Sequence, residues 1–291
     1  MALSISEVLD KLVAREDTKT SINSMTPKAS AIGTLLSQVG NPIRNVSSPV
    51  QAYTTLTDAS FGTWDNSSAK DSQALAGDIG EMTAVTAYAI VAYPLNYDVD
   101  IASFPQEFAM TMANGFAKYI DDRVLNTAAT GIIPLASGVS NTKITTASGA
   151  TTFQLYSDLV ATMGLVNADG FRVNGILAEL AENANVLNAL STTGQPVFSI
   201  DANGQIGRLV GRPYAETFVN LANGARFVVG DWSKVTAAIV NDLKFEKFTS
   251  GSVNISGTEY NLIERNMVAV RAEARFMFKV TQAAAFAYLY S

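Results

Sequence analysis

Histidine and cysteine are both absent from the 291 residues of this chain. Without histidine, no Ser-His or Cys-His pair can activate a nucleophile, and the commonest zinc and iron ligand is missing. Without cysteine, there is no disulfide framework and no thiolate chemistry. An enzyme would have to rely on carboxylates, lysine or tyrosine alone. We therefore expect a protein that is not an enzyme, with no metal and no cofactor.

Charge is scarce as well. Charged residues make up 16% of the chain and hydrophobic residues 48%, whereas a typical soluble domain has roughly 25% charged residues. A surface with so few charges is expected to be buried against other copies of the chain. The net charge of −6 gives no basic patch for nucleic-acid recognition.

Membrane and secretion signals are also missing from the sequence. No run of about 18 apolar residues is present, so no membrane span is expected. The first residues, 1–7, lack the basic and apolar regions of a signal peptide. We expect the chain to be a cytosolic product.

The most informative stretch covers residues 262–280, near the end of the chain. Every second residue from Val268 is apolar, namely Val268, Val270, Ala272, Ala274, Phe276, Phe278 and Val280. The positions between them include Arg271, Glu273, Arg275 and Lys279. This alternation predicts a strand with one buried and one polar face. If unbroken, it runs for about 19 residues, or roughly 60 Å at ~3.3 Å per residue, which favours an extended, plate-like subunit.

A long helix is expected over residues 103–130. Ser103 and Gln106 form a capping box, and Pro105 is tolerated in the first turn. Apolar residues then recur at every fourth position: Phe104, Phe108, Met112, Phe116, Ile120 and Val124. The helix is expected to contain ~27 residues and to be roughly 40 Å long.

The segment before residue 50 has little periodicity. Ser4 and Glu7 form a capping box for a helix that ends near Arg15. This helix is either a short surface helix or a docking helix on a mobile arm. The following segment, 16–49, is about 34 residues long, which is too long for an ordinary loop. We expect an arm that extends over a neighbouring subunit.

Residues 50–57 and 83–93 are rich in β-branched and aromatic residues and predict the two strands of a hairpin. The polar tip between them, 58–80, has Phe61 and Trp64 as its only large aromatic residues. A lone hairpin is marginally stable in water. We therefore expect it to rest on another subunit, with Phe61 and Trp64 among the contacts.

The middle of the chain alternates between helix and strand patterns, which predicts a mixed α/β lobe. The expected elements are helices at 153–166 and 179–190 and strands at 173–178, 212–218 and 226–229. Residues 231–248 are compatible with a strand or a short helix, and 254–257 predict a turn. The lobe is thus inserted between the long helix and the closing strand.

Motifs for chemistry are weak. Gly204, Gly207 and Gly211 do not have the spacing of a dinucleotide turn, and there is no Walker-type motif. The pairs Asp121-Asp122 and Glu179/Glu182 are interpreted as solvated carboxylates on helix surfaces.

Taken in this order, the elements resemble those of a major capsid protein of a tailed bacteriophage (Caudovirales) with the Hong Kong 97 type of fold. The resemblance extends from about Val50 to the end of the chain. The most similar segments are 208–214, 228–232 and 264–276. The resemblance implies an α+β fold with these parts: an N-terminal arm (1–49), an extended β-hairpin called the E-loop (50–93), a peripheral domain with a spine helix at 103–130 (94–150), an inserted axial α/β domain (151–258) and closing strands of the peripheral domain (259–291).

The resemblance also implies a function. Such proteins self-assemble into hexamers and pentamers that form an icosahedral shell around double-stranded DNA. We expect the chain in the virion, assembled in the host bacterial cytoplasm, with partners that are other copies of itself and a portal. The sequence does not decide whether scaffolding or decoration proteins take part. Because the chain starts at Met1, we expect either a separate scaffolding protein or none. The shell would face the packaged DNA without binding it sequence-specifically, and the negative net charge of −6 agrees with such a non-binding wall.

Some members of this family join subunits by an isopeptide bond, in which a lysine attacks an asparagine and a glutamate assists. Lys70 matches the lysine, and Asn266 and Glu273 match the asparagine and glutamate. The alternative role for Glu273 is an ion pair with Arg271 or Arg275. Arg271, Arg275 and Lys279 are expected to form a contact edge between neighbours.

Two other functions stay open from the sequence. An encapsulin-like cargo compartment would use the same architecture. A carboxylate-based hydrolase would instead be a monomer or small oligomer with a deep acidic cleft.

Overall fold

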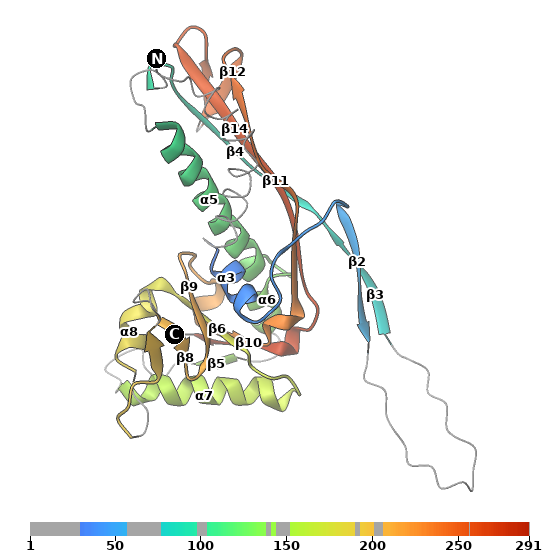
Figure 1. The fold of residues 1–291 in the computed structure, drawn as a ribbon, viewed down its shortest axis with the longest axis vertical. Coiled ribbons are helices and arrows are strands. Elements are labelled where there is room, and N and C mark those ends of the chain that lie inside the picture. The colour runs from blue at the N-terminus through green and yellow to red at the C-terminus, as the bar shows by residue number, and fades with distance from the viewer. Residues whose placement is uncertain are drawn as a thin grey trace, which may run out of the picture.

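The structure is a computed structural model that describes residues 30–56, 77–97, 104–137, 141–143, 152–189, 193–200, 206–255 and 257–290. The molecule is elongated, with a narrow part built from long strands and a helix, a wider lobe at one end, and a β-hairpin that projects sideways (Figure 1). The extended shape expected from the closing strand is confirmed.

A four-stranded sheet runs along the narrow part. Its order is β1-β11-β14-β4, with β1 at Arg44–Asn45, β11 at Val235–Phe248, β14 at Met267–Val280 and β4 at Val85–Pro94. β14 is antiparallel to both of its neighbours. It contains 14 residues, fewer than predicted, because residues 262–266 form turns before the strand begins.

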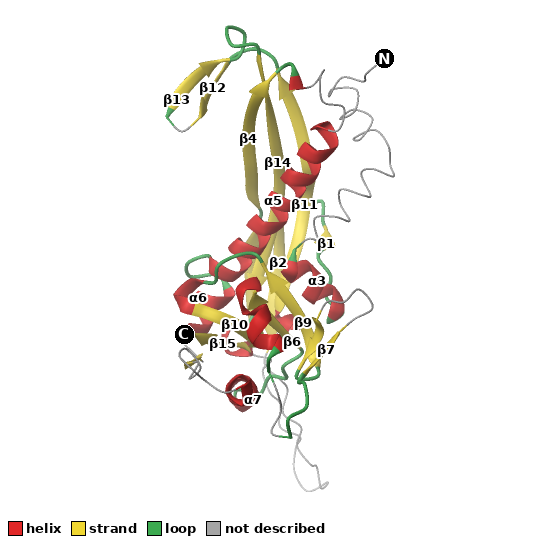
Figure 2. Ribbon diagram, turned by 90° about the vertical axis from the view of Figure 1, so that its left-hand side faces the viewer, coloured by secondary structure: helices red, strands yellow, loops and turns green. Residues whose placement is uncertain are grey.

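One face of this sheet is covered by helix α5, at Phe104–Asn126 (Figure 2). The rings of Phe116 and Tyr119 meet Phe276 of β14 edge-on, with centroids 6.2 and 5.8 Å apart. Further along, Phe108 packs in one cluster with Val268 and Val270. The apolar stripes predicted for the helix and for the strand therefore face each other in the structure.

The projecting hairpin consists of β2, Val50–Leu56, and β3, Gly77–Thr83. The predicted second strand, 83–93, is wrong as a hairpin strand, because β4 leaves the hairpin after Ala84 and pairs with β14. Strand propensity predicts that a segment is a strand but not which strand it pairs with. The partner of β4 is β14, which lies far along the chain. At the base of the hairpin, Met82 packs against Met277 and Ala238.

Residues 30–49 do not extend away from the subunit, so the predicted arm is wrong for this part. Helix α3, at Ala31–Gln38, buries Ile32, Leu35 and Leu36 completely. Burying each such side chain contributes about 1.5–3 kcal/mol. The sequence prediction failed because a helix of 8 residues is too short to give a clear period. The predicted helix before Arg15 lies outside the described residues.

The lobe contains a seven-stranded sheet with the order β5-β15-β10-β6-β9-β8-β7. The strands are β5 Asn141–Lys143, β15 Phe286–Tyr290, β10 Ala225–Gly230, β6 Gly175–Glu179, β9 Arg212–Thr217, β8 Ile206–Leu209 and β7 Phe198–Ile200. Side chains alternate between its two faces. Ile176 and Val229 pack against helix α7, Thr152–Ala168, whereas Leu177 and Val228 lie in the core shared with α3 and with α6, Ile132–Ser137.

Strand pairing changes two of the predicted boundaries. β11 lies inside the predicted axial range 151–258, but it pairs with β14 in the long sheet. β15 lies inside the predicted closing range 259–291, but it pairs with β10 in the lobe. The chain therefore crosses between the two parts once more than expected. The ambiguous segment 231–248 contains a short 3-10 turn, Trp232–Lys234, followed by β11.

Further short elements lie in the lobe and at the end of the long sheet. The predicted helix 179–190 is shorter, with a 3-10 turn at Leu180–Glu182 and α8 at Asn183–Leu187. The predicted turn at 254–257 joins β12, Ser252–Ile255, to β13, Thr258–Asn261. This small hairpin projects from the far end of the long sheet (Figure 2). Among the described residues, no helix is long and apolar enough to cross a membrane.

Candidate assembly surfaces

The face of the long sheet turned away from α5 carries both charges and apolar side chains. Arg271 of β14 lies opposite Ile90 of β4 and Glu246 of β11, and Glu273 lies opposite Tyr88 and Lys244. Tyr88 and Ile90 are 73% and 49% exposed. We call these residues, together with Arg275, the outer sheet face. An aromatic and an aliphatic side chain among charges of both signs is typical of a contact surface.

Three of the charges on this face, Arg271, Glu246 and Glu273, are paired with one another. The Arg271 guanidinium forms an ion pair with Glu246, and its Nε lies 3.8 Å from Glu273. The same guanidinium lies 5.5 Å from the centre of the Phe248 ring. These side chains are about half exposed, so the pairs contribute little to the stability of a lone subunit. They present charges of both signs to whatever covers the face.

The other predicted contact residues lie at different places. Arg275 is half-buried opposite Asn241 and Thr86 in the middle of the sheet, and Lys279 is half-buried opposite Thr236 nearer the lobe. Phe61, Trp64 and Lys70 lie outside the described residues. Arg271, Glu273 and Arg275 are thus brought onto one face. Lys279 lies in the same row, beyond Met277, which is buried at the base of the hairpin.

Asn266 lies in a turn rather than in the strand. Its φ of 48° is in the left-handed region, which asparagine tolerates, and its carbonyl accepts a hydrogen bond of 2.8 Å from the Leu95 amide. Glu273 is seven residues further on, roughly 23 Å away along a strand. The two residues therefore cannot serve one reaction within a single subunit. They are placed so that different subunits would have to use them.

Asp121 of α5 is a buried carboxylate that joins three elements. It is 3% exposed, and it accepts hydrogen bonds from the Ser30 hydroxyl, the Ala31 amide at 2.9 Å, the Ile32 amide at 3.2 Å and the Thr217 hydroxyl at 3.3 Å. Burial raises the pKa of Asp121, while these hydrogen bonds act in the opposite direction. The carboxylate ties the start of α3 to α5 and to β9 of the lobe.

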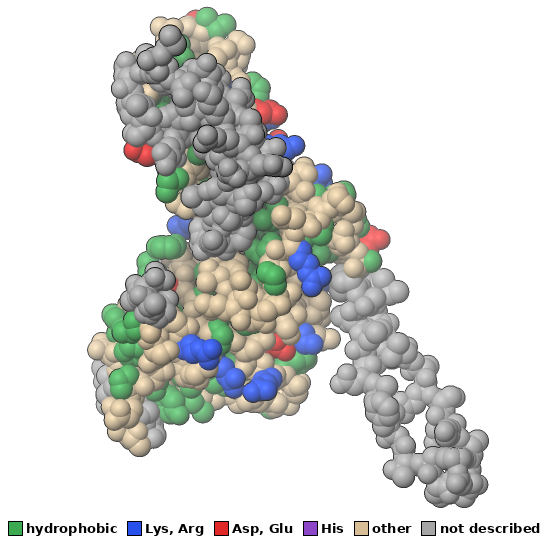
Figure 3. Space-filling model, viewed as in Figure 1, with side chains coloured by type: hydrophobic (Ala, Val, Ile, Leu, Met, Phe, Trp, Pro, Cys, Tyr) green, Lys and Arg blue, Asp and Glu red, His purple; other side chains and the backbone are tan. Residues whose placement is uncertain are grey.

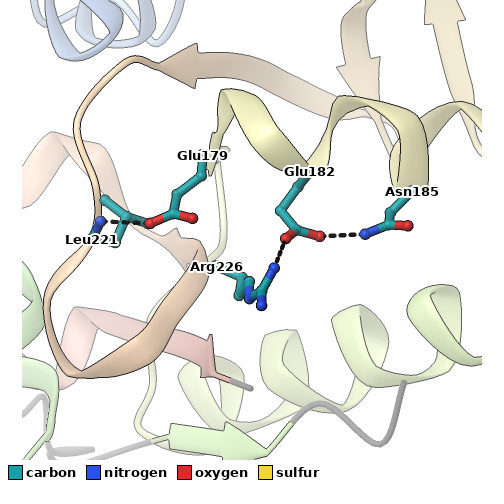
Figure 4. Close-up of polar contacts among 5 residues, drawn as sticks. All are labelled: Glu179, Glu182, Asn185, Leu221 and Arg226. Atoms are coloured by element: carbon teal, nitrogen blue, oxygen red, sulfur yellow. Dashed lines mark hydrogen bonds and ion pairs between the residues drawn. The ribbon is translucent and has the colours of Figure 1, made fainter. Parts of the chain in front are cut away.

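Figure 4 shows a second group of buried or partly buried carboxylates, in the lobe. Glu182, 3% exposed, pairs with Arg226 and accepts a hydrogen bond of 2.7 Å from Asn185. Glu179 accepts a hydrogen bond of 2.6 Å from the Leu221 amide. The prediction that Asp121, Glu179 and Glu182 are solvated is therefore wrong. Asp122, in contrast, is exposed.

One signal in the sequence marks Asp121. The residues Ala113, Ala117, Asp121 and Leu125 recur at every fourth position of α5, and all are buried. They form a second buried stripe beside the predicted one. A carboxylate within such a stripe needs donors from another element, which is what α3 supplies.

The described residues offer little for catalysis. In this part of the chain, no group of three or more acidic side chains is arranged to hold a metal ion. An open groove of about 450 Å³ lies between α5 and the end of β9, and its lining includes Lys118, Tyr119, Asp122 and Phe218. The groove is shallow, unlike the deep acidic cleft expected of a carboxylate-based hydrolase.

A sequence profile described as the phage capsid family matches residues 12–290. The chain belongs to the phage capsid family. A search of the curated proteins found no match. The resemblance inferred from the sequence is thereby confirmed, and the protein is a structural component of a phage capsid.

Solved structures support the fold of this capsid protein. It is similar to a structure from Mycobacterium phage Cain, with a TM-score of 0.69, 17% identity and 90% of each chain covered. A structure from Mycobacterium phage Adephagia gives a TM-score of 0.68 and 16% identity over 90% of this chain and 89% of that one. The capsid of an empty GTA particle gives 0.57 and 18% identity over 90% of both chains. The α+β capsid fold of the Hong Kong 97 type is confirmed.

Proposed function

We propose that this capsid protein assembles with itself into rings of six and five copies, and that the rings form an icosahedral shell around the double-stranded DNA of a tailed phage. The observation that carries the proposal is the family match over almost the whole chain. The subunit has two features that a shell needs, an elongated shape and a projecting hairpin (Figure 1). On the outer sheet face, charges of both signs lie beside the exposed side chains of Tyr88 and Ile90. Many modest contacts would then add up to a stable particle.

Within this shell, the outer sheet face meets a neighbouring copy. Arg271 and Arg275 present positive charge and Glu246 and Glu273 negative charge, so two different copies can pair opposite signs across a contact. Lys279 extends this row. The hairpin, through Phe61 and Trp64, rests on an adjacent subunit and holds the copies together.

The remaining partners follow from the same proposal. The shell joins a portal and encloses DNA without sequence-specific contacts. Assembly takes place in the host cytoplasm, and the finished protein resides in the virion. An encapsulin-like compartment would have a similar shell but other contents. A terminase or portal gene beside this gene favours the phage, and a peroxidase or ferritin-like gene favours the compartment.

The isopeptide bond stays a prediction. The Lys70 amine would attack the amide carbon of Asn266 in another subunit, ammonia would leave, and Glu273 of a third subunit would take up and return the proton. A denaturing gel of mature particles tests this bond. Ladders of multimers are expected from it, and a single band at 30.9 kDa contradicts it.

Expression of the full chain followed by size-exclusion chromatography and negative-stain electron microscopy tests the shell itself. Round particles of some tens of nanometres, eluting in the void volume, are the expected result. A monomer or a small oligomer that persists at high protein concentration would contradict the proposal.

A further inference from the structure

Four asparagines of the chain are followed directly by glycine: Asn114, Asn174, Asn203 and Asn223. Such pairs are chemically susceptible to deamidation, because glycine has no side chain to hinder the attack of its amide nitrogen on the asparagine side chain. Asn203 lies outside the described residues. The structure places the other three in different surroundings, which decide where the reaction can take place.

Two of these three asparagines are protected. Asn114 lies within α5, where helical hydrogen bonds hold the backbone. Both polar atoms of the Asn174 side chain are engaged, since the nitrogen donates to Asp231 at 2.7 Å and the oxygen accepts a hydrogen bond of 2.8 Å from the Trp232 amide. The glycine after Asn174 is packed so tightly that an added Cβ atom would touch the Trp232 ring. This site leaves no space for the cyclic intermediate of deamidation.

Asn223, in contrast, lies in an exposed tight turn. It has a φ of 57° and a ψ of 24°, and Gly224 has a φ of 68°. The Ala225 amide closes the turn by donating to the Ala222 carbonyl. This is a type I′ turn, for which Asn-Gly is the preferred pair. Both central residues are exposed, and the Asn223 side chain makes no hydrogen bond within the part of the chain that the structure describes.

The chain just before this turn is fixed to two other elements. The side chain of Asn126, at the end of α5, donates to the Asn220 carbonyl and accepts from the Ala222 amide, both at 2.8 Å. Glu179 of β6 accepts a hydrogen bond of 2.6 Å from the Leu221 amide (Figure 4). Side chains outside the turn therefore hold it in one shape.

The closed turn keeps the reacting atoms apart. With a ψ of 24°, the Gly224 nitrogen lies nearly opposite to the Cβ atom of Asn223 across the Cα–C bond, so it does not reach the side-chain carbon. The reaction needs a local opening of the turn. We propose that Asn223 is a site of spontaneous deamidation, and that Asn126 is a positioning residue that sets the rate by keeping the turn closed.

The chemistry requires only water. In the opened turn, the Gly224 nitrogen attacks the side-chain carbon of Asn223 and a C–N bond forms. The C–NH₂ bond breaks, and ammonia leaves with the proton of the Gly224 amide. Water then opens the succinimide, which gives aspartate or isoaspartate at this position. No oxidant, reductant or cofactor takes part.

The reaction changes the charge of the subunit. Figure 3 shows large areas of the described surface without acidic or basic side chains. Each reacted copy gains one carboxylate, which makes the net charge of −6 more negative. The inference goes beyond the proposed function and is independent of it, since it needs only the folded subunit.

Peptide mapping by mass spectrometry tests the site, after incubation of the full chain at mildly alkaline pH. We expect the peptide with Asn223 to deamidate before those with Asn114 and Asn174. In Asn223→Gly, which suits the positive φ, the fold should be kept and the product at this position should be absent. A peptide with Asn223 that stays unmodified, or that reacts more slowly than either of the other two, would overturn the proposal.

The role of Asn126 is tested by Asn126→Ala, which removes both hydrogen bonds to the loop. Asn223 should then deamidate roughly tenfold faster, whereas Asn174 should keep its slow rate because the fold is intact. Asn114→Ala is the matched control, the same change at an exposed position of α5, and should leave the rate at Asn223 unchanged. An unchanged rate in Asn126→Ala, or an equal acceleration at Asn174, would overturn the positioning role.

Glu179→Ala gives an independent second test of the closed turn. This variant frees the Leu221 amide and should also accelerate the reaction at Asn223. Glu179→Gln keeps an acceptor oxygen and should restore the slow rate. Equal rates at Asn223 in these two variants and the unmodified protein would contradict the control of deamidation by the fixed loop.

Discussion

The buried carboxylates and the outer sheet face use charge in opposite ways. Asp121 and Glu182 are each 3% exposed, and partners from other elements of the same subunit satisfy them. Arg271 and Glu246 are 38% and 56% exposed and pair across a single strand boundary. Buried polar groups depend on every partner, whereas exposed pairs contribute little to folding. We conclude that the first set holds the subunit together, and we propose that the second acts between subunits.

The largest effect is expected from a charge placed beneath the sheet. Phe276 is 2% exposed and packs against α5, so Phe276→Asp buries a carboxylate without a partner and should abolish soluble subunits. Phe276→Leu is the control, with an expected loss of about 1 kcal/mol. Soluble yield and particle counts in lysates measure both. Normal particles from Phe276→Asp would contradict the position of the strand under the helix.

Removal of the Asp121 carboxylate comes next. Asp121→Ala leaves two backbone amides and two hydroxyls without their acceptor, which should cost about 3–5 kcal/mol. Asp121→Asn keeps one acceptor oxygen and should cost less. Urea unfolding followed through the fluorescence of the buried Trp232 measures the difference. Equal stability of Asp121→Ala and the unmodified protein would show that α3 does not depend on this carboxylate.

The pKa of Asp121 predicts a smaller, pH-dependent effect. Because this pKa is raised in the folded state, folding favours the protonated form. The resulting stabilisation is full below the unfolded pKa of about 3.8 and is lost as the pH rises through the folded pKa. Relative to Asp121→Asn, the unmodified protein should therefore gain stability as the pH falls from 7 toward 4. A stability difference that is constant over this range would contradict this assignment.

The smallest effect on folding is expected at the outer sheet face. Arg271→Ala removes an exposed ion pair and should change the free energy of unfolding by about 0–1 kcal/mol. If this face is a contact, the same variant should still reduce the yield of particles. Arg208→Ala, an exposed arginine of the lobe, is the matched control. Equal particle yields for the two variants would remove Arg271 from the assembly contacts.

Local pattern predicted the long elements well. The stripe from Phe104 to Val124 and the alternation from Val268 to Val280 predicted α5 and β14, because both periods are long and regular. The order of helices and strands carried the resemblance that led to the family. Fold and function were therefore accessible from the sequence.

Features that depend on distant partners were not accessible. Residues 83–93 have the composition of a strand, yet nothing local to them indicates that β14 is the partner of β4. Asp121 resembles a solvated helix residue until Ser30 and Thr217 are brought to it by the fold. The contact residues of the hairpin, Phe61 and Trp64, stay predictions, since they lie outside the described residues.

A cryo-electron microscopy reconstruction of particles formed by the unmodified chain is the most direct test. We predict a closed icosahedral shell in which Arg271, Arg275 and Tyr88 are covered by a neighbouring copy, while Asp121 and Glu182 keep their partners within one subunit. A shell in which the outer sheet face is exposed to solvent, or in which Asp121 bonds to another copy, would contradict this division between holding the subunit and joining its neighbours.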